Sequence, residues 1–352
     1  MTELITQNKI EIINTIKLLI FKEQVSLFEK LDFEDDNTFL EPLLFSYFNS
    51  NKENTSLNRG VEELLQPYFL VKEGKLLNEL PLKKDDLEIV KEIHPLLGKY
   101  FHESARGELI NPNPEHNSVW KMHYQQLFDA VTIIKTHLPE FYAEFAFANK
   151  KVYLHDNSNI LNFTSIETLG MLFFYVIGTD NLIYFIEELI HQGSHNYFYY
   201  VIHNRTDFFK IDVDTLVMRN YTKQQWDYRT IYGAFHGLFT VTKRVVCFDQ
   251  LLTKNVFSGR EKHELLGRLT DQFKRFRTGL ESLDFNQIYT KKGIALYYEL
   301  DTKCETILKK YTSLTTEFDL SNRNIDFRYS DFCELNPLED FLEKDEKGFF
   351  NF

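Results

Sequence analysis

Two histidines four residues apart in an apolar run place the strongest constraint on how this chain folds. The stretch Glu187–His195 reads Glu-Glu-Leu-Ile-His-Gln-Gly-Ser-His, so His191 and His195 are in an i, i+4 relation. On an α-helix this spacing puts both rings on one face, about 6 Å apart along the axis. One helix can then present two imidazoles to a single metal ion. The sequence therefore predicts a helix that carries part of a metal site.

The residue that follows the first histidine narrows the chemistry of this site. A zinc peptidase with this histidine spacing uses a glutamate there as its general base, whereas this chain has Gln192. An amide cannot accept the proton of a metal-bound water. Glu188 is expected either to hold the outer nitrogen of a ligating imidazole or to face solvent. We expect Gln192 and Glu188 beside the metal in a catalytic role, but not in ordinary peptide hydrolysis.

A third ligand is expected further along the chain. His203 follows His195 by eight residues, about 12 Å along the same helix, which is too far. His236 is the better candidate because Gly233 and Gly237 surround it on a predicted apolar helix. Glycine inside a helix costs roughly 1 kcal/mol relative to alanine, so two of them indicate a demand of packing or function. A tight helix crossing around a buried histidine explains the same pattern.

These motifs together resemble a known family. The chain is similar to the HExxH-motif peptide-modification proteins in two motifs, His191-Gln192-x-x-His195 and Asp227-x-Arg229-x-x-x-Gly233-x-x-His236-Gly237. That family comprises 2-oxoglutarate-dependent peptide β-hydroxylases encoded beside ribosomally made peptides. The resemblance covers roughly residues 150–250. It implies Fe(II) bound by His191, His195 and His236, with 2-oxoglutarate as co-substrate and a ribosomal precursor peptide as substrate.

The resemblance leaves the third ligand open. A set of three protein ligands leaves positions on Fe(II) for a bidentate co-substrate and for dioxygen. The usual third ligand in such oxygenases is a carboxylate, and a set of three histidines would be a variant. Asp227, and less plausibly Asp180 or Glu188, are therefore alternatives to His236.

The co-substrate needs a cation for its distal carboxylate, and the fork of an arginine suits it best. Arg244 lies two helical turns after His236, and its side chain is expected to lean back toward that histidine. Arg229 lies in the family-like motif but precedes His236 by seven residues, where the tilt leads away. Geometry favours Arg244 and the resemblance favours Arg229. Either one is alternatively a structural partner of Asp227 or Asp249.

The hydrophobic spacing predicts a mainly α fold with a small β-sheet. Helices are expected over residues 3–31 (one helix or a pair), 41–50, 61–71, 82–101, 118–148 with a break at Pro139, 180–203, 231–252, 260–280 and 288–312. Strands are expected over residues 151–154, 160–163 and 170–176, the last one preceding the helix with the histidine pair. For the apolar run 170–176, a helix that begins at Ser165 is the alternative, because periodicity alone does not separate the two. We expect a helical N-terminal region, residues 1–110, packed on a metal-binding core with C-terminal helices, residues 111–352. Gly107–Asn117 would link them, and the two parts form either two domains or one continuous domain.

Charge and composition exclude several partners. A net charge of −12 leaves no basic surplus for nucleic acid, and would suit a cationic peptide. No run of 18 apolar residues is present, so no membrane span is expected. The three cysteines, Cys247, Cys304 and Cys333, are scattered, which fits a reducing cytoplasm better than a disulfide framework. Four aromatic residues are candidates to line a peptide groove or to fill the core: Tyr197, Tyr199, Tyr200 and Trp226.

The function expected is an Fe(II)/2-oxoglutarate-dependent oxygenase that hydroxylates a side-chain carbon of a ribosomally made peptide. A zinc hydrolase-like metalloprotein would use the same ligands, but it needs a relocated base such as Glu188. A non-catalytic peptide-binding helical protein is favoured by Gln192. A di-iron carboxylate bundle would use Glu188-x-x-His191, but the chain has no convincing second motif of this kind at a matching position.

Overall fold

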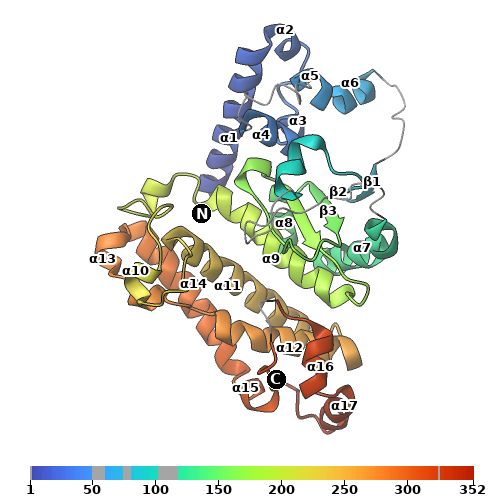
Figure 1. The fold of residues 1–352 in the computed structure, drawn as a ribbon, viewed down its shortest axis with the longest axis vertical. Helices are drawn as coiled ribbons and strands as arrows, with labels where there is room; N and C mark the ends of the chain where they lie inside the picture. Colours follow the sequence, from blue (N-terminus) through green and yellow to red (C-terminus); the bar gives the residue numbers. More distant parts are fainter. Residues whose placement is uncertain (1, 50–59, 74–80, 102–117, 324–325) are drawn as a thin grey trace. The chain divides into compact units, whose positions relative to one another are not determined.

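The structure is a computed structural model that describes residues 2–49, 60–73, 81–101, 118–323 and 326–352. It divides into two compact units: unit 1 comprises Met1–Phe128, Glu144–Gly178 and Tyr199–His203, and unit 2 comprises Asp129–Ala143, Thr179–Phe198 and Asn204–Phe352. The described residues are mainly helical with one four-stranded sheet, which confirms the predicted fold class (Figure 1). The boundary expected near residue 110 and the linker Gly107–Asn117 lie outside the described residues.

Unit 1 combines one long helix and several short ones with the sheet. Its elements in chain order are α1 (Thr2–Glu23), α2 (Val25–Phe28), α3 (Asp36–Phe39), α4 (Pro42–Asn49), α5 (Val61–Leu64), α6 (Gln66–Lys72), β1 (Leu82–Lys84), β2 (Leu87–Val90), η2 (Pro95–Phe101), β3 (Lys151–His155), η3 (Ile166–Thr168) and β4 (Met171–Tyr175). Two further helices, α7 (Val119–His137) and α8 (Pro139–Ala148), are divided between the units. The helix break predicted at Pro139 is confirmed, since α7 ends and α8 begins there.

The sheet has the strand order β1-β2-β3-β4. β1 and β2 form an antiparallel hairpin, while β2, β3 and β4 run parallel to one another. The strands β3 and β4 are buried almost throughout, as expected for parallel strands that carry near-continuous apolar runs. The strands predicted at residues 151–154 and 170–176 are thereby confirmed. A core of buried apolar side chains packs on the sheet: Leu97, Phe101, Tyr153, Ile160, Met171 and Phe173.

Two predicted elements of unit 1 are wrong. The segment 82–101, expected as a helix, forms the β1–β2 hairpin and the 3-10 helix η2. The hairpin turns at Asp85, which adopts the left-handed conformation with φ at +51°. Leu87 and Ile89 are buried while their neighbours are half-buried, so the burial period is two residues and not that of a helix. Residues 160–163, expected as a strand, contribute only an isolated bridge from Phe163 to Phe173.

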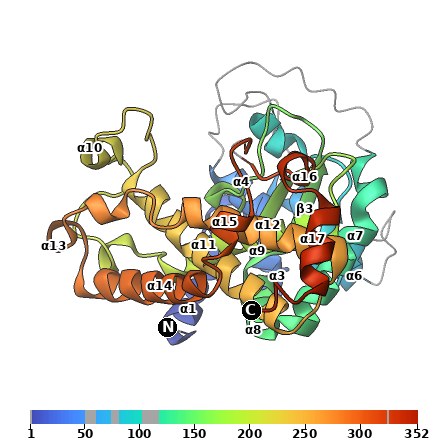
Figure 2. The ribbon, with the colours of Figure 1, turned by 90° about the horizontal axis from the view of Figure 1, so that it is seen from below.

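Unit 2 is a helical assembly. Its elements are α9 (Leu182–Val201, of which the last three residues belong to unit 1), η4 (Arg205–Asp207), α10 (Arg219–Thr222), α11 (Ile231–Thr253), α12 (Gly259–Arg275), η5 (Leu280–Ser282), α13 (Phe285–Ile288), α14 (Lys291–Lys310), α15 (Leu314–Glu317), α16 (Tyr329–Leu335) and α17 (Leu338–Glu346). The four long helices α9, α11, α12 and α14 were each predicted within a few residues of their observed ends. α11 packs along α14 and also contacts α12, and Figures 1 and 2 show α11 and α14 side by side.

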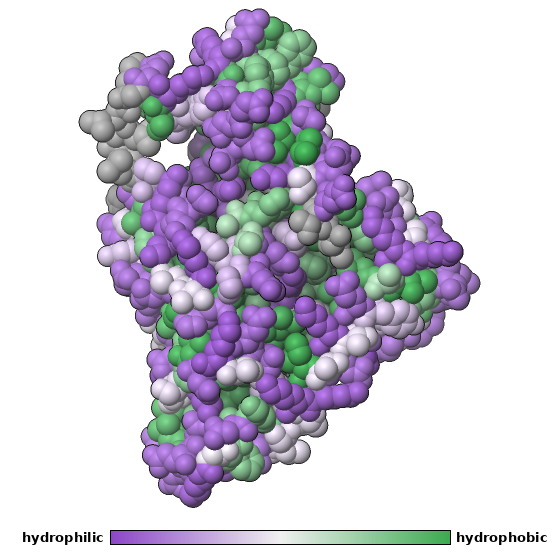
Figure 3. Space-filling model, turned by 180° about the vertical axis from the view of Figure 1, so that it is seen from behind, coloured by the Kyte–Doolittle hydropathy of each residue, from purple (hydrophilic) through white to green (hydrophobic). Residues whose placement is uncertain are grey.

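The surface of the protein is largely hydrophilic on the face shown in Figure 3, where hydrophobic side chains gather only in small groups. Trp226 is one of the large aromatic residues that stay exposed, with 65% of its surface accessible. Within the described ranges, no helix has both the length and the apolar character that crossing a membrane requires.

Candidate metal centre

The histidine pair lies in the middle of α9, as predicted. Asn181 begins this helix, because its side-chain oxygen accepts a hydrogen bond from the amide of Ile183 at 3.0 Å. Apolar side chains at Leu189 and Ile190 are fully buried. The helical spacing then brings the ring centroids of His191 and His195 to 4.9 Å.

The third histidine, His236, lies in the second turn of α11. This helix begins after Thr230, whose hydroxyl accepts a hydrogen bond from the amide of Gly233 at 3.0 Å. Phe198 of α9 packs on the ring of His236 with their centroids 4.7 Å apart. This contact helps to hold α9 against α11 within unit 2.

The three imidazoles form one contiguous group. Nδ1 of His195 lies 2.8 Å from Nε2 of His236, and Nε2 of His195 lies 3.2 Å from Nε2 of His191. Two nitrogens that bind one zinc or iron ion at about 2.1 Å lie about 3.0–3.5 Å apart. The separations in the trio are therefore close to those between ligands on a shared ion.

The trio is not a finished ligand set, because His195 meets its two neighbours with different nitrogens. In the part of the chain that the structure describes, no group of three or more His, Cys, Asp or Glu side chains has the arrangement of a metal site. The same contacts are satisfied by a chain of hydrogen bonds, in which His236 donates to His195 and His195 donates to His191. An ion shared by all three rings would take one nitrogen of His195, so a turn of that ring would accompany metal binding.

The protonation state of the three rings is compatible both with a shared metal ion and with a chain of hydrogen bonds. Burial lowers the pKa of His191, His195 and His236 well below the usual value for histidine. For His191 and His195 the positive charge of Arg244 lowers the pKa further. All three are therefore neutral near pH 7, the state in which imidazole binds a metal.

Glu188 and Gln192 both lie behind the ring of His191. Oε2 of Glu188 is 3.7 Å from Nδ1 of His191, and the amide nitrogen of Gln192 donates to the same carboxylate oxygen at 3.2 Å. Burial, together with the charge of Glu187, raises the pKa of Glu188 to about 7. Nε2 of His191 faces His195, so Nδ1 is its outer nitrogen. Glu188 and Gln192 lie beside Nδ1, which is the position of a side chain that orients a metal-binding imidazole. Their role in catalysis stays a prediction.

Arg244 lies in the buried interior of unit 2. Its Nη1 donates to Oε1 of Glu187 on α9 at 3.2 Å. Only 4% of its surface is exposed, and its Nε has no hydrogen-bond partner among the described residues. An arginine with an unpaired buried nitrogen is available to an anionic ligand.

Arg229 and the alternative carboxylates have other partners. Arg229 donates to both carboxylate oxygens of Asp227, each at 2.8 Å, and also to the carbonyl of Thr278 at 3.0 Å. This is the structural pairing that the sequence left open for Arg229. Asp180 is paired with Arg328, at 3.1 Å.

Sequence reasoning missed the buried charges around Arg244. Glu187 also accepts a hydrogen bond at 2.5 Å from Arg268 of α12, and Arg268 in turn donates to Glu264 at 2.7 and 3.0 Å. The signal was present in the sequence: Glu264 and Arg268 are four residues apart among leucines, which places a charged pair on the apolar face of a helix.

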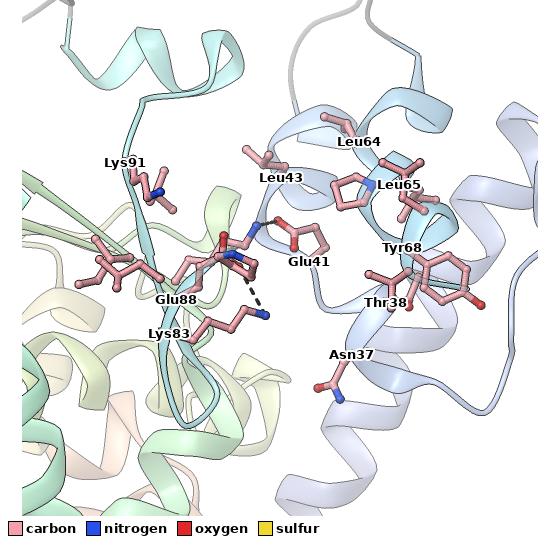
Figure 4. Close-up of a pocket in the computed structure, with 18 of the residues that line it drawn as sticks. Asn37, Thr38, Glu41, Leu43, Leu64, Leu65, Tyr68, Lys83, Glu88 and Lys91 are labelled. Atoms are coloured by element: carbon pink, nitrogen blue, oxygen red, sulfur yellow. Dashed lines mark ion pairs between the residues drawn. The ribbon is translucent and has the colours of Figure 1, made fainter. Parts of the chain in front are cut away.

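Unit 1 contains a separate cavity of about 650 Å³ between α3–α6 and the β1–β2 hairpin. Figure 4 shows Glu41, Leu43, Tyr68 and Glu88 among its lining residues. Glu41 pairs with Lys151 there at 2.8 Å. The cavity is lined by no histidine, so it is distinct from the candidate metal centre.

Among the aromatic candidates for a peptide groove, Tyr200 is buried, Tyr197 and Tyr199 are half-buried and Trp226 is exposed. Tyr199 and Tyr200 belong to unit 1, and the other two belong to unit 2. That the four line one groove stays a prediction.

Comparisons with known proteins do not assign the chain to a family. No family model matches the chain, and no curated protein matches it. The resemblance to the peptide-modification family therefore rests on the two histidine motifs alone.

Proposed function

We propose that this protein is an Fe(II)- and 2-oxoglutarate-dependent oxygenase that hydroxylates a side-chain carbon of a ribosomally made peptide. In this reaction one atom of dioxygen enters the C–H bond of the peptide and the other enters succinate, while 2-oxoglutarate loses CO₂. The observation that carries the proposal is the trio of imidazoles, with ring nitrogens 2.8 and 3.2 Å apart, near a buried arginine that is incompletely paired.

The donor set fits a divalent transition metal. Imidazole nitrogen suits iron, zinc and copper, and three such ligands leave positions open for a chelating co-substrate. His191, His195 and His236 would hold the ion. Fe(II) bound there would supply the oxidising chemistry, which no protein side chain of the site provides.

The surrounding side chains would position the reactants and exclude water. Phe198 covers one face of His236, and all three histidines are largely shielded from solvent. A Cβ at Gly237, the residue after His236, would meet no atom within 4 Å apart from its chain neighbours and its own helix backbone, so the space at Gly237 is open. This space would admit a substrate, while the buried surroundings protect the reaction from bulk water.

Arg244 would bind the distal carboxylate of 2-oxoglutarate. It lies two turns after His236 on α11, its charge lowers the pKa of His191 and His195, and its Nε is a buried donor without a partner among the described residues. Arg229 is less suited because Asp227 and Thr278 already occupy its fork.

A zinc hydrolase-like protein is the rival that uses the same ligands. It needs a carboxylate base on the side of the metal-bound water. Glu188 is the nearest carboxylate to His191, and it faces Nδ1, the nitrogen turned away from His195. This placement supports an orienting role for Glu188 and disfavours hydrolysis.

Anaerobic titration with Fe(II) and 2-oxoglutarate tests the proposal. We expect one equivalent of Fe(II) to bind and a visible charge-transfer band to develop only when both are present. Admission of air should then yield succinate, even without peptide. An iron-loaded sample that shows neither the band nor succinate would contradict the proposal and favour a non-catalytic protein.

A further inference from the structure

The buried charges of unit 2 form a chain that ends at the metal centre. Glu264 and Arg268 belong to α12, Glu187 belongs to α9 and Arg244 belongs to α11. Arg268 bridges the two carboxylates, donating to Glu264 at 2.7 Å and to Glu187 at 2.5 Å. Glu187 then accepts from Arg244 through its other oxygen at 3.2 Å. Three helices are therefore tied together at one fully buried set of ions.

Stability alone is a weak reason for such a chain. Taking charges out of water costs several kcal/mol each, and well-packed apolar residues of similar volume often serve a fold equally well or better. Each of the four side chains is at most 5% exposed. Two carboxylates balance two guanidinium groups, so the chain is neutral as a whole and can persist in the interior.

The hydrogen bonds of the chain fix where the free part of Arg244 lies. Oε1 of Glu187 holds Nη1 of Arg244, and Oε2 is committed to Arg268. The amide nitrogen of Gln272 donates to the carbonyl of Arg268 at 2.9 Å and lies 3.5 Å from the same Oε1 of Glu187. Glu187 therefore cannot turn away without breaking contacts to two other helices. Nε of Arg244 is left buried and unpaired, and an unpaired charged donor costs free energy until a ligand accepts from it.

We infer that Glu187 is a positioning residue that holds Arg244 in place to bind the carboxylate of the anionic co-substrate. Arg268, anchored by Glu264, keeps Glu187 in that orientation. Glu187 lies one helical turn before His191, so the same helix sets both the imidazole and the support of the arginine. The inference rests on the proposed function, because it assigns the binding of 2-oxoglutarate to Arg244.

The test compares co-substrate binding with metal binding in the full-length protein. Binding of 2-oxoglutarate is measured anaerobically in the Fe(II)-loaded protein, and Fe(II) binding is measured separately. Glu187→Gln should raise the Kd for 2-oxoglutarate by about 10–100-fold, the range found when outer partners of a site are removed. Its Fe(II) affinity should change by less than about threefold, since the three imidazoles remain.

A control is Asp301→Asn, which weakens a partly buried acid–arginine pair with Arg277 and leaves the hydrogen bond of Arg244 to Glu187 untouched. It should leave the Kd for 2-oxoglutarate unchanged. If Glu187→Gln does not fold, Arg268→Lys serves in its place, because lysine keeps the charge but cannot bridge two carboxylates as a fork. It should raise the same Kd in the same direction.

A second readout does not depend on turnover. In protein labelled with ¹⁵N-arginine, the Nε–H signal that Arg244→Lys removes should shift when 2-oxoglutarate is added, and Glu187→Gln should abolish that shift. An unchanged Kd and shift in Glu187→Gln would overturn the inference and leave the proposed function intact. A wild-type protein that binds Fe(II) but not 2-oxoglutarate would instead overturn the proposed function itself.

Discussion

Nδ1 of His195 on α9 lies 2.8 Å from Nε2 of His236 on α11, although 41 residues separate the two histidines in the chain. Phe198, one turn after His195, packs on the same ring of His236. These contacts bring together the two histidine motifs, which in the sequence are only known to follow one another along the chain. It is the structural basis for treating them as one centre.

Gly237 and Gly293 offer a paired test of what the glycines do in unit 2. A Cβ at Gly237 would meet nothing within 4 Å, so Gly237→Ala should raise the free energy of unfolding by roughly 0.5–1 kcal/mol through helix propensity. A Cβ at Gly293 would lie 2.1 Å from the backbone oxygen of Phe208, so Gly293→Ala should lower it by about 1–3 kcal/mol. Chemical denaturation measures both.

If Gly237→Ala also destabilises the protein, then packing, and not the open space at Gly237, explains that glycine. The same variant should lower succinate formation if a substrate occupies the space. Stability and activity would then move in opposite directions, which a purely structural role does not predict.

Substitution of Arg244 and Arg229 tests which of the two arginines binds the distal carboxylate of 2-oxoglutarate. Arg244→Lys should raise the Kd for 2-oxoglutarate by about 10–100-fold, since a charge-assisted hydrogen bond is worth about 1.5–3 kcal/mol. Arg229→Lys should leave that Kd within about threefold of the wild type, because the fork of Arg229 is bound to Asp227. Calorimetric titration of the anaerobic metal-loaded proteins makes the comparison. The reverse order of effects would assign the carboxylate to Arg229.

We expect unit 1 to lose stability in mild acid because of one buried histidine, His155. It is 4% exposed at the end of β3, its ring nitrogens have no hydrogen-bond partner among the described residues, and burial lowers its pKa from 6.5 to about 4. Between these values the unfolded chain binds a proton that the folded protein does not bind. This contribution to stability is therefore complete above pH 6.5 and is lost as the pH falls toward 4.

From pH 7 to pH 5 the loss from His155 should be about 2 kcal/mol in the free energy of unfolding. Its ring is surrounded by Phe101, Tyr153 and Tyr175. His155→Phe should therefore be tolerated, raise stability at pH 7 and reduce the difference between the two pH values. Denaturation curves at both pH values would speak against the account if the variant kept the full difference.

The sequence predicted the long helices and the histidine pair because both are local patterns. The i, i+4 relation of His191 and His195 survives any packing, as does the apolar stripe of α11. The hairpin at Leu82–Val90 was misjudged because its two strands are only three and four residues long, too short for a period of two to be distinguished from a helical one.

The environment of the site required the three-dimensional structure. Helix tilt predicts that Arg244 leans toward His236, but it could not reveal the partner of Arg244, Glu187, 57 residues earlier in the chain. Nor could spacing show that Glu188 faces Nδ1 of His191, since a ring's orientation depends on its neighbours. Contacts of this kind are set by how α9, α11 and α12 pack together.

The most direct test of the central claim is a titration of the metal-free protein with Fe(II) under nitrogen, carried out on the wild type and on three single variants. The wild type should bind one ion per chain, and His191→Ala, His195→Ala and His236→Ala should each weaken binding by more than about 100-fold, beyond the effect of an outer partner. Circular dichroism should show that each variant is folded. If His236→Ala binds Fe(II) as tightly as the wild type, the three histidines do not share one ion, and the account of the centre is wrong.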